Sequence, residues 1–225
     1  EHTFNLVDVV RIDHFNGFAK YWEVKVGETN GATGHWVVGP GEDFLSTIYQ
    51  SLGVRPIIAE DLGEAAKEAA ILRKKFDIPG MSILQFAFGE NENINGNLKS
   101  LDSEINVVYT GTHDNDTTLG WFQTLPESVI STQIAADIVK ERKRALKFLG
   151  TDGSEINWDL ISLALHSKAN TVIIPLQDIL GLGTNARMNT PGTIEGNWQW
   201  RFKNNTLTND IIERMRTLTE ESKRL

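Results

Sequence analysis

The stretch Val7-Asp8-Val9-Val10-Arg11-Ile12-Asp13 is a β-branched run of strand type that ends in a carboxylate. Two later stretches follow the same plan: Pro56-Ile57-Ile58-Ala59-Glu60 and Val107-Val108-Tyr109-Thr110-Gly111-Thr112-His113-Asp114. In a parallel barrel the carboxyl ends of all strands open on one face. We therefore expect Asp13, Glu60 and Asp114 to converge in one pocket. Pairs of convergent carboxylates are typical of enzymes that break and remake glycosidic bonds.

Strand-type runs alternate with helical patterns along the whole chain. Strands are expected at about 6–12, 55–59, 82–88, 106–110 and 171–176. Helices are expected at 41–52, 64–76, 127–149, 158–167 and, after a Thr208 cap, 209–223. This alternation predicts an α/β protein with a parallel sheet and right-handed crossovers.

Five strands are fewer than the eight of a (β/α)₈ barrel. The alternatives are an open doubly wound sheet, or roughly the last five βα units of a barrel whose first strands are missing. The chain begins at Glu1 and not at Met, which favours the second alternative. Residues 1–225 are expected to form one domain, with no second domain.

Composition excludes several classes of protein. Among 225 residues, 22 are basic and 30 are acidic, giving a net charge of −8, and no basic stripe suits a nucleic-acid backbone. No apolar run approaches the roughly 20 residues that span a bilayer. The absence of cysteine excludes disulfides and thiolate metal sites. We therefore expect no nucleic-acid partner and no membrane contact.

Arg11 and Asp13 are two residues apart on an expected strand, so their side chains leave it on the same side. A guanidinium beside a carboxylate favours the ionised form and fixes its orientation. An oriented, ionised aspartate suits a glycosidase nucleophile. A structural ion pair at a strand end is the alternative.

Glu60 follows three apolar residues and precedes Asp61. Its position at an apolar strand end, near other acids, predicts a raised pKa and a role as general acid and base. The alternative is a helix start, because Asp61 and Glu64 stand where a helix dipole favours negative charge.

Thr112-His113-Asp114-Asn115-Asp116 is the densest polar cluster. His113 and Asp114 suit hydrogen bonds to adjacent sugar hydroxyls. His113, Asp114 and Asp116 also suit a divalent metal. A third reading is a hydrogen-bonded turn before a helix. Spacing alone leaves all three open.

Five tryptophans fall in expected loops or element ends: Trp22, Trp36, Trp121, Trp198 and Trp200. Their flat apolar faces can pack against sugar rings, or they can close the rim of the barrel. Gln177, where the strand at 171–176 ends, adds a polar group at the expected active face.

Eight short stretches resemble signatures of the 4-α-glucanotransferases, also called amylomaltase or disproportionating enzyme. They occur in family order and cover nearly the whole chain: Arg11-Ile12-Asp13-His14-Phe15, Gly39-Pro40-Gly41, Ile58-Ala59-Glu60-Asp61-Leu62-Gly63, Pro79-Gly80-Met81, Gly111-Thr112-His113-Asp114-Asn115-Asp116-Thr117, Pro175-Leu176-Gln177-Asp178, Ala186-Arg187-Met188-Asn189-Thr190-Pro191-Gly192 and Gly196-Asn197-Trp198. The resemblance implies a (β/α)₈ barrel and retaining transfer of α-1,4-glucan segments by double displacement.

The resemblance also implies roles for single residues. Asp13 matches the family's nucleophile, Glu60 its general acid/base, and Asp114 the third acid, which binds sugar hydroxyls. In a retaining enzyme the two working carboxyls lie about 5–5.5 Å apart. The expected substrate-binding residues are Arg11, His113, Trp22, Asp61 and Gln177.

No cofactor and no metal are implied. The expected partners are α-1,4-glucans, maltooligosaccharides and the remaining strands of the same barrel, in bacterial cytoplasm or plastid stroma. The rival functions are a non-catalytic glucan-binding fragment, a hydrolytic α-amylase-like enzyme and a metal-dependent hydrolase.

Overall fold

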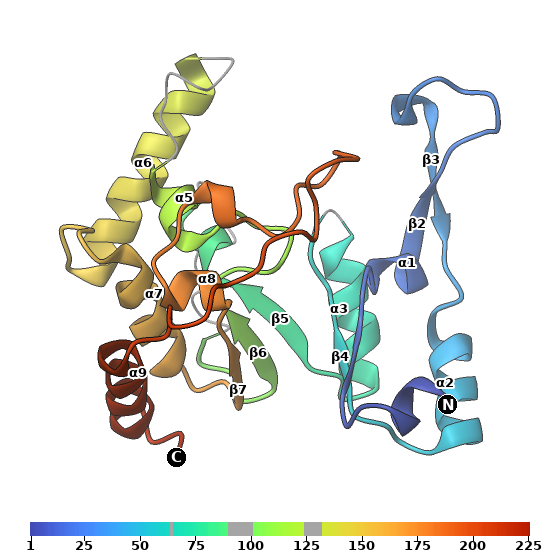
Figure 1. Ribbon diagram of the computed structural model, residues 1–225. Helices are drawn as coiled ribbons and strands as arrows, with labels where there is room; N and C mark the ends of the chain where they lie inside the picture. Colours follow the sequence, from blue (N-terminus) through green and yellow to red (C-terminus); the bar gives the residue numbers. More distant parts are fainter. Residues whose placement is uncertain (64, 90–100, 124–131) are drawn as a thin grey trace. The chain divides into compact units, whose positions relative to one another are not determined.

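The computed structural model describes residues 1–63, 65–89, 101–123 and 132–225 (Figure 1). The chain divides into two compact units. Unit 1 comprises residues 1–81 and 105–107, and unit 2 comprises residues 82–104 and 108–225. The expectation of a single domain stays a prediction.

Unit 1 is built around two parallel strands and the helices beside them. Its elements are η1 (Thr3–Asn5), β1 (Val10–Ile12), α1 (Asn16–Ala19), β2 (Lys20–Glu23), η2 (Gly31–Thr33), β3 (His35–Val38), α2 (Gly41–Leu52), β4 (Ile57–Ala59) and α3 (Ala66–Lys75). Strands β1 and β4 pair in parallel, with Ile12 opposite Ala59. Phe15, Leu45 and Ala69 are fully buried in the core beneath them.

A β-hairpin interrupts unit 1 between α1 and α2. Strands β2 and β3 pair antiparallel with Trp22 opposite Trp36, and Figure 1 shows them side by side. The sequence pattern predicted that these tryptophans lie in loops or at element ends, which is wrong, because both lie within strands. Trp121, also assigned to a loop or element end, lies within helix α5 (Thr118–Gln123).

Unit 2 continues the alternation of strands and helices. Besides α5, elements that lie wholly or partly in it are β5 (Gly80–Ile83), η3 (Leu84–Phe86), β6 (Asn106–Tyr109), α6 (Thr132–Leu149), α7 (Ile156–Leu165), β7 (Thr171–Ile173), α8 (Leu176–Ile179), η5 (Thr184–Ala186) and α9 (Asn209–Glu221). Strands β5, β6 and β7 form one sheet in that order. The core packs Phe88 and Val108 against Leu160 of α7.

The expected elements occur in the expected order, and α2 has the expected bounds. The strand expected at 82–88 is wrong beyond Ile83, where a 3₁₀ turn begins. The strand expected at 171–176 ends at Ile173, because Pro175 caps helix α8. Residues 64 and 127–131 of two expected helices lie outside the described residues. Within the described ranges, no helix has the length and apolar character needed to cross a membrane.

Candidate active site

The parallel pairing of β1 with β4 places two acids at neighbouring strand ends in unit 1. Strand β1 ends at Ile12 and strand β4 at Ala59, and Asp13 and Glu60 follow them directly. The backbone N–H of Glu60 donates to the carbonyl of Ile12 at 3.0 Å. Both acids therefore emerge from the carboxyl ends of adjacent parallel strands, as sequence analysis predicted.

The register makes this placement specific. Ile12 and Ala59 are paired residues, and Asp13 and Glu60 are the residues that follow them in each strand. The backbone N–H of Phe15 also donates to the carbonyl of Glu60, at 3.1 Å. The two strand ends are therefore joined by backbone hydrogen bonds on both sides of the acids.

Arg11 holds Asp13 as the two-residue spacing predicted. Its Nη1 donates to Asp13 Oδ1 at 2.8 Å, and its Nε lies 3.3 Å from the sulfur of Met81. The Arg11 side chain is 25% exposed, whereas that of Asp13 is 73% exposed. The guanidinium thus approaches from the protein side and leaves the carboxylate open to an incoming molecule.

Glu60 is half-buried, and this burial raises the pKa of its carboxyl above the ordinary value, as expected from its sequence position. The nearby charge of Asp13 adds to the increase. Hydrogen bonds from the backbone N–H groups of His14 (2.7 Å) and Leu62 (3.3 Å), and the charge of Arg11, act in the opposite direction. The raised pKa favours a carboxyl that can donate a proton.

His14 connects the two acids, a role that the sequence pattern did not predict. Its φ of +47° lies in the left-handed region, which non-glycine residues seldom adopt. This conformation accompanies the hydrogen bond from its backbone N–H to Glu60. Strain of about 1–3 kcal/mol is typical of such positions near functional sites. The order of Asp13 and His14 in the sequence did not indicate this conformation or this hydrogen bond.

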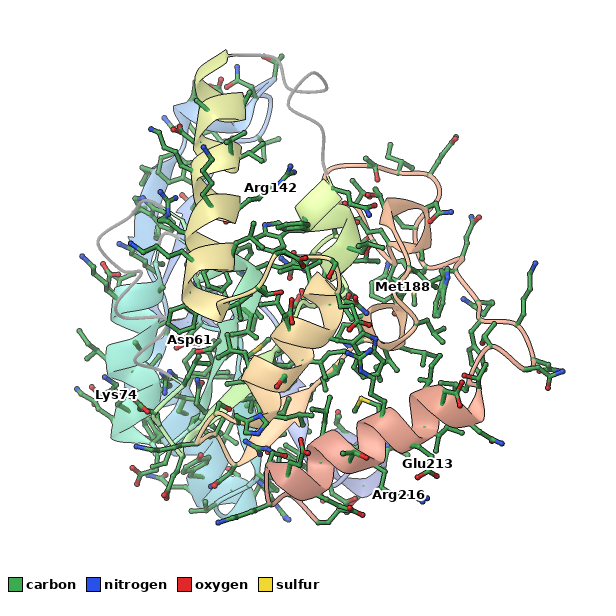
Figure 2. The ribbon with its side chains drawn as sticks, turned by 90° about the vertical axis from the view of Figure 1, so that its left-hand side faces the viewer. Asp61, Lys74, Arg142, Met188, Glu213 and Arg216 are labelled. Carbon is green, nitrogen blue, oxygen red and sulfur yellow. The ribbon has the colours of Figure 1, made fainter. Side chains whose placement is uncertain are left out.

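Asp61, expected to bind substrate, has both carboxylate oxygens engaged within the protein. One accepts from Arg73 Nε at 2.5 Å and the other from the backbone N–H of Met81 at 3.1 Å. Its side chain is 7% exposed; Figure 2 labels the residue. The helix-start alternative is not observed either, since α3 begins at Ala66 without a side-chain cap. Glu64 lies outside the described residues. These contacts favour a structural role for Asp61.

Asp114 lies in unit 2 on the loop after β6. Its Oδ1 accepts from Asn189 Nδ2 at 2.5 Å, and its backbone carbonyl accepts from Arg187 Nη2 at 2.5 Å. His113 Nε2 lies 3.4 Å from Asp114 Oδ2, and its ring lies 4.9 Å from the ring of Trp198. A segment more than 70 residues downstream therefore positions both residues.

The third reading of the polar cluster, a hydrogen-bonded turn, is confirmed. Asn115 Oδ1 accepts from the backbone N–H and the hydroxyl of Thr112, at 2.9 and 2.8 Å. This turn does not use the side chain of Asp114, so a turn and a sugar contact are compatible. Arg187 and Asn189 belong to the motif at 186–192, but nothing in the sequence pattern indicated that they support Asp114.

A cavity of about 170 Å³ adjoins this loop. His113, Gln177 and Trp198 are among its lining residues, as is Met188, which Figure 2 labels. The amide of Gln177 donates to the carbonyl of Ala186 at 3.2 Å. Beside it, burial raises the pKa of Asp178, which accepts from the Thr110 hydroxyl at 2.5 Å. Gln177 thus faces a cavity but is tied to the backbone.

The metal-site alternative finds no support in this arrangement. Asp116 turns to Thr184, whose hydroxyl donates to its Oδ2 at 2.8 Å, while Asp114 is held by Asn189. Within the described part of the chain, no three His, Cys, Asp or Glu side chains are grouped so as to hold a metal ion.

Comparison with known proteins places these residues in a family. A family model described as 4-alpha-glucanotransferase matches residues 1–208. This chain belongs to the 4-alpha-glucanotransferase family. A 4-alpha-glucanotransferase of Synechocystis is 44% identical over 217 residues, which are 95% of this chain and 40% of the relative. A chloroplastic/amyloplastic 4-alpha-glucanotransferase of Arabidopsis thaliana is 45% identical over 203 residues, or 90% of this chain and 33% of the relative.

The 4-alpha-glucanotransferase fold is also found by comparison of structures. An amylomaltase from Streptococcus agalactiae in complex with acarbose has a TM-score of 0.83 and 31% identity, covering 97% of this chain and 42% of that one. The expected fold class, α/β and part of a (β/α)₈ barrel, is therefore confirmed. The chain spans about one third to two fifths of the length of these relatives.

The structure brings Asp13, Glu60 and Arg11 together within unit 1, and Asp114 with His113 within unit 2. Convergence of the two groups on one sugar ring stays a prediction. The spacing of about 5–5.5 Å between the working carboxyls stays a prediction as well.

Proposed function

We propose that this chain carries the acids of a 4-α-glucanotransferase, which transfers α-1,4-glucan segments between maltooligosaccharides by a retaining double displacement. The register of β1 and β4 carries the proposal, because it places a guanidinium-held Asp13 next to a half-buried Glu60. The relatives' names support the same activity.

In the first step, a carboxylate oxygen of Asp13 attacks the anomeric carbon of the donor. Glu60 donates its proton to the glycosidic oxygen, and the shortened glucan leaves with a new hydroxyl. In the second step, Glu60 takes a proton from the acceptor's 4-hydroxyl, which displaces Asp13 and forms a new α-1,4 bond. Burial assists the first step, since it keeps the Glu60 proton available at higher pH.

Asp114 and His113 bind hydroxyls of the reacting sugar in this proposal, and Arg11 orients the nucleophile. Trp22 and Gln177 are proposed as further substrate contacts. We leave Asp61 out, because Arg73 and Met81 already engage its carboxylate.

Strands outside this chain complete the barrel in this proposal, which agrees with the two-fifths coverage of the relatives. We propose bacterial cytoplasm or plastid stroma as the compartment, because one relative is bacterial and another is chloroplastic/amyloplastic. No cofactor takes part in the proposed steps.

Incubation of the protein that carries this chain with maltotriose tests the proposal. A ladder of longer and shorter maltooligosaccharides plus glucose, resolved by chromatography, is the expected result. Hydrolysis products without longer oligomers would show an α-amylase-like enzyme. Binding without any product would show a non-catalytic glucan-binding protein, and loss of activity with a chelator would contradict the metal-free mechanism.

A further inference from the structure

The β2–β3 hairpin of unit 1 bounds a cavity of about 320 Å³, which His14, the residue after Asp13, also lines. Six of the residues that line it are His14, Asn16, Lys20, Trp22, Trp36 and Leu62. We call it the tryptophan cavity. It is distinct from the cavity beside Asp114, which lies in unit 2.

The two tryptophans present a formed apolar surface. Their ring centroids lie 5.3 Å apart at 74°, and the two residues remain 43% and 42% exposed. The Trp22 indole N–H donates to the carbonyl of Gly31 at 2.7 Å, and a Cβ at Gly34 would collide with that indole. The orientation of Trp22 is thus set before any ligand arrives.

Polar groups complete the wall around this surface. Lys20 Nζ lies 4.9 Å from the centre of the Trp36 ring and 2.6 Å from Glu68 Oε1. Asn16 is 3% exposed; its Nδ2 donates to the Leu62 carbonyl, whereas its buried Oδ1 has no hydrogen-bond partner within the described residues. A buried acceptor without a donor is unfavourable, and a ligand hydroxyl would satisfy it.

His14 links this cavity to the proposed chemistry. It follows Asp13, its backbone N–H donates to Glu60, and its side chain lines the cavity. A ring bound there would therefore contact the residue that follows Asp13 and whose backbone N–H binds Glu60.

We propose that the tryptophan cavity binds a glucose unit of an α-1,4-glucan next to the reacting ring. The ring packs against Trp22 and Trp36, and one of its hydroxyls donates to Asn16 Oδ1. This inference rests on the proposed function for the identity of the sugar. Flat aromatic surfaces with a few polar groups at the edge suit a pyranose, which has apolar faces and a polar rim.

The primary test is titration of the ¹⁵N-labelled protein with maltoheptaose, followed through the tryptophan indole N–H signals. The signals of Trp22 and Trp36, assigned by Trp→Phe variants, are expected to shift saturably. Absence of a shift at both would overturn the inference. Cellopentaose, which is β-linked, is expected to shift them much less, and an equal response would overturn the assignment to α-glucans.

Variants extend the test. Trp22→Ala is expected to weaken maltoheptaose binding about tenfold. Tyr21→Ala is the matched control, because Tyr21 neighbours Trp22 on β2 and points to the opposite face of the hairpin. Gly34→Ala retains both tryptophans, but its Cβ would meet the Trp22 indole and the Glu23 carbonyl oxygen, so it is expected to distort this wall of the cavity and to weaken binding as well. Equal affinity in all three variants would contradict the proposal.

The variant Glu60→Gln separates this inference from the proposed function. It is expected to lose transfer activity and to keep the shifts of the two indole signals. If the wild type turned over maltotriose but these signals did not respond, the proposed role of the cavity would be contradicted and the proposed function would not. A response without turnover in the wild type would contradict the proposed function alone.

Discussion

The acid pair of unit 1 and the acid of unit 2 are positioned by different means. Asp13 and Glu60 follow paired residues of two parallel strands, so backbone register sets their places. Asp114 lies on a loop and depends on Arg187 and Asn189, which come more than 70 residues later. A carboxylate at the end of a strand-type run can be recognised in a short stretch of sequence, whereas the distant side chains that hold Asp114 cannot.

Asp13→Asn tests the acid pair of unit 1 and has the largest expected effect. We expect turnover of maltotriose to fall by at least about 10³-fold with the fold retained, because the change removes the proposed nucleophile and not a core group. Circular dichroism and chromatography of products measure the two effects. Asp8→Asn, an exposed change in the same segment, is the control. Near-normal rates in Asp13→Asn would refute the assignment.

Asn189→Ala tests whether unit 2's acid needs its distant support. The change removes the donor to Asp114 Oδ1, so we expect a loss of roughly 10²-fold in kcat/KM from misplacement of the carboxylate. Steady-state kinetics with maltotriose measure it. Asn204→Ala, at an exposed position in the following loop, should not change the rate. If the two variants behaved alike, the loop would hold Asp114 without Asn189.

Asp61→Ala distinguishes a structural acid from a substrate contact within unit 1. It leaves Arg73 without its buried partner, so we expect the free energy of unfolding to fall by about 3 kcal/mol. Urea denaturation measures the change. Glu42→Ala breaks the exposed pair with Lys75 and should cost at most about 1 kcal/mol. A raised KM with unchanged stability would instead support a substrate contact at Asp61.

The pH dependence of stability gives the smallest effect. Because the folded-state pKa of Glu60 is raised, its stabilising contribution is full below the ordinary glutamate pKa and is lost as pH rises through the raised value. The free energy of unfolding of the Glu60→Gln variant should therefore lack this decrease with rising pH.

Glu68 serves as a control, because its pKa is shifted in the opposite direction to that of Glu60. Its hydrogen bond from Lys20 lowers its pKa, so its contribution is present above the ordinary value and is lost as pH falls through the lowered one. Glu68→Gln should therefore lose stability at neutral pH, with the difference disappearing in acid. Thermal unfolding at a series of pH values checks both variants, and slopes of the same sign would contradict the two assignments.

The local pattern was enough to predict α2, the order of strands and helices, and the raised pKa of Glu60. Apolar periodicity, a terminal glycine and the apolar run before Glu60 each act within a few residues of chain. The β2–β3 hairpin was missed, because its pairing joins residues across a loop and depends on cross-strand contact between Trp22 and Trp36.

By itself, the sequence determined the α/β alternation, the family and the candidates Asp13, Glu60 and Asp114. Only the tertiary structure decided that Asp61 is engaged by Arg73, that Asn189 holds Asp114, and that the two tryptophans border a cavity. The physical reason is distance along the chain. Hydrogen bonds and packing between residues far apart leave no local pattern, since any polar or aromatic side chain brought close by the fold can form them.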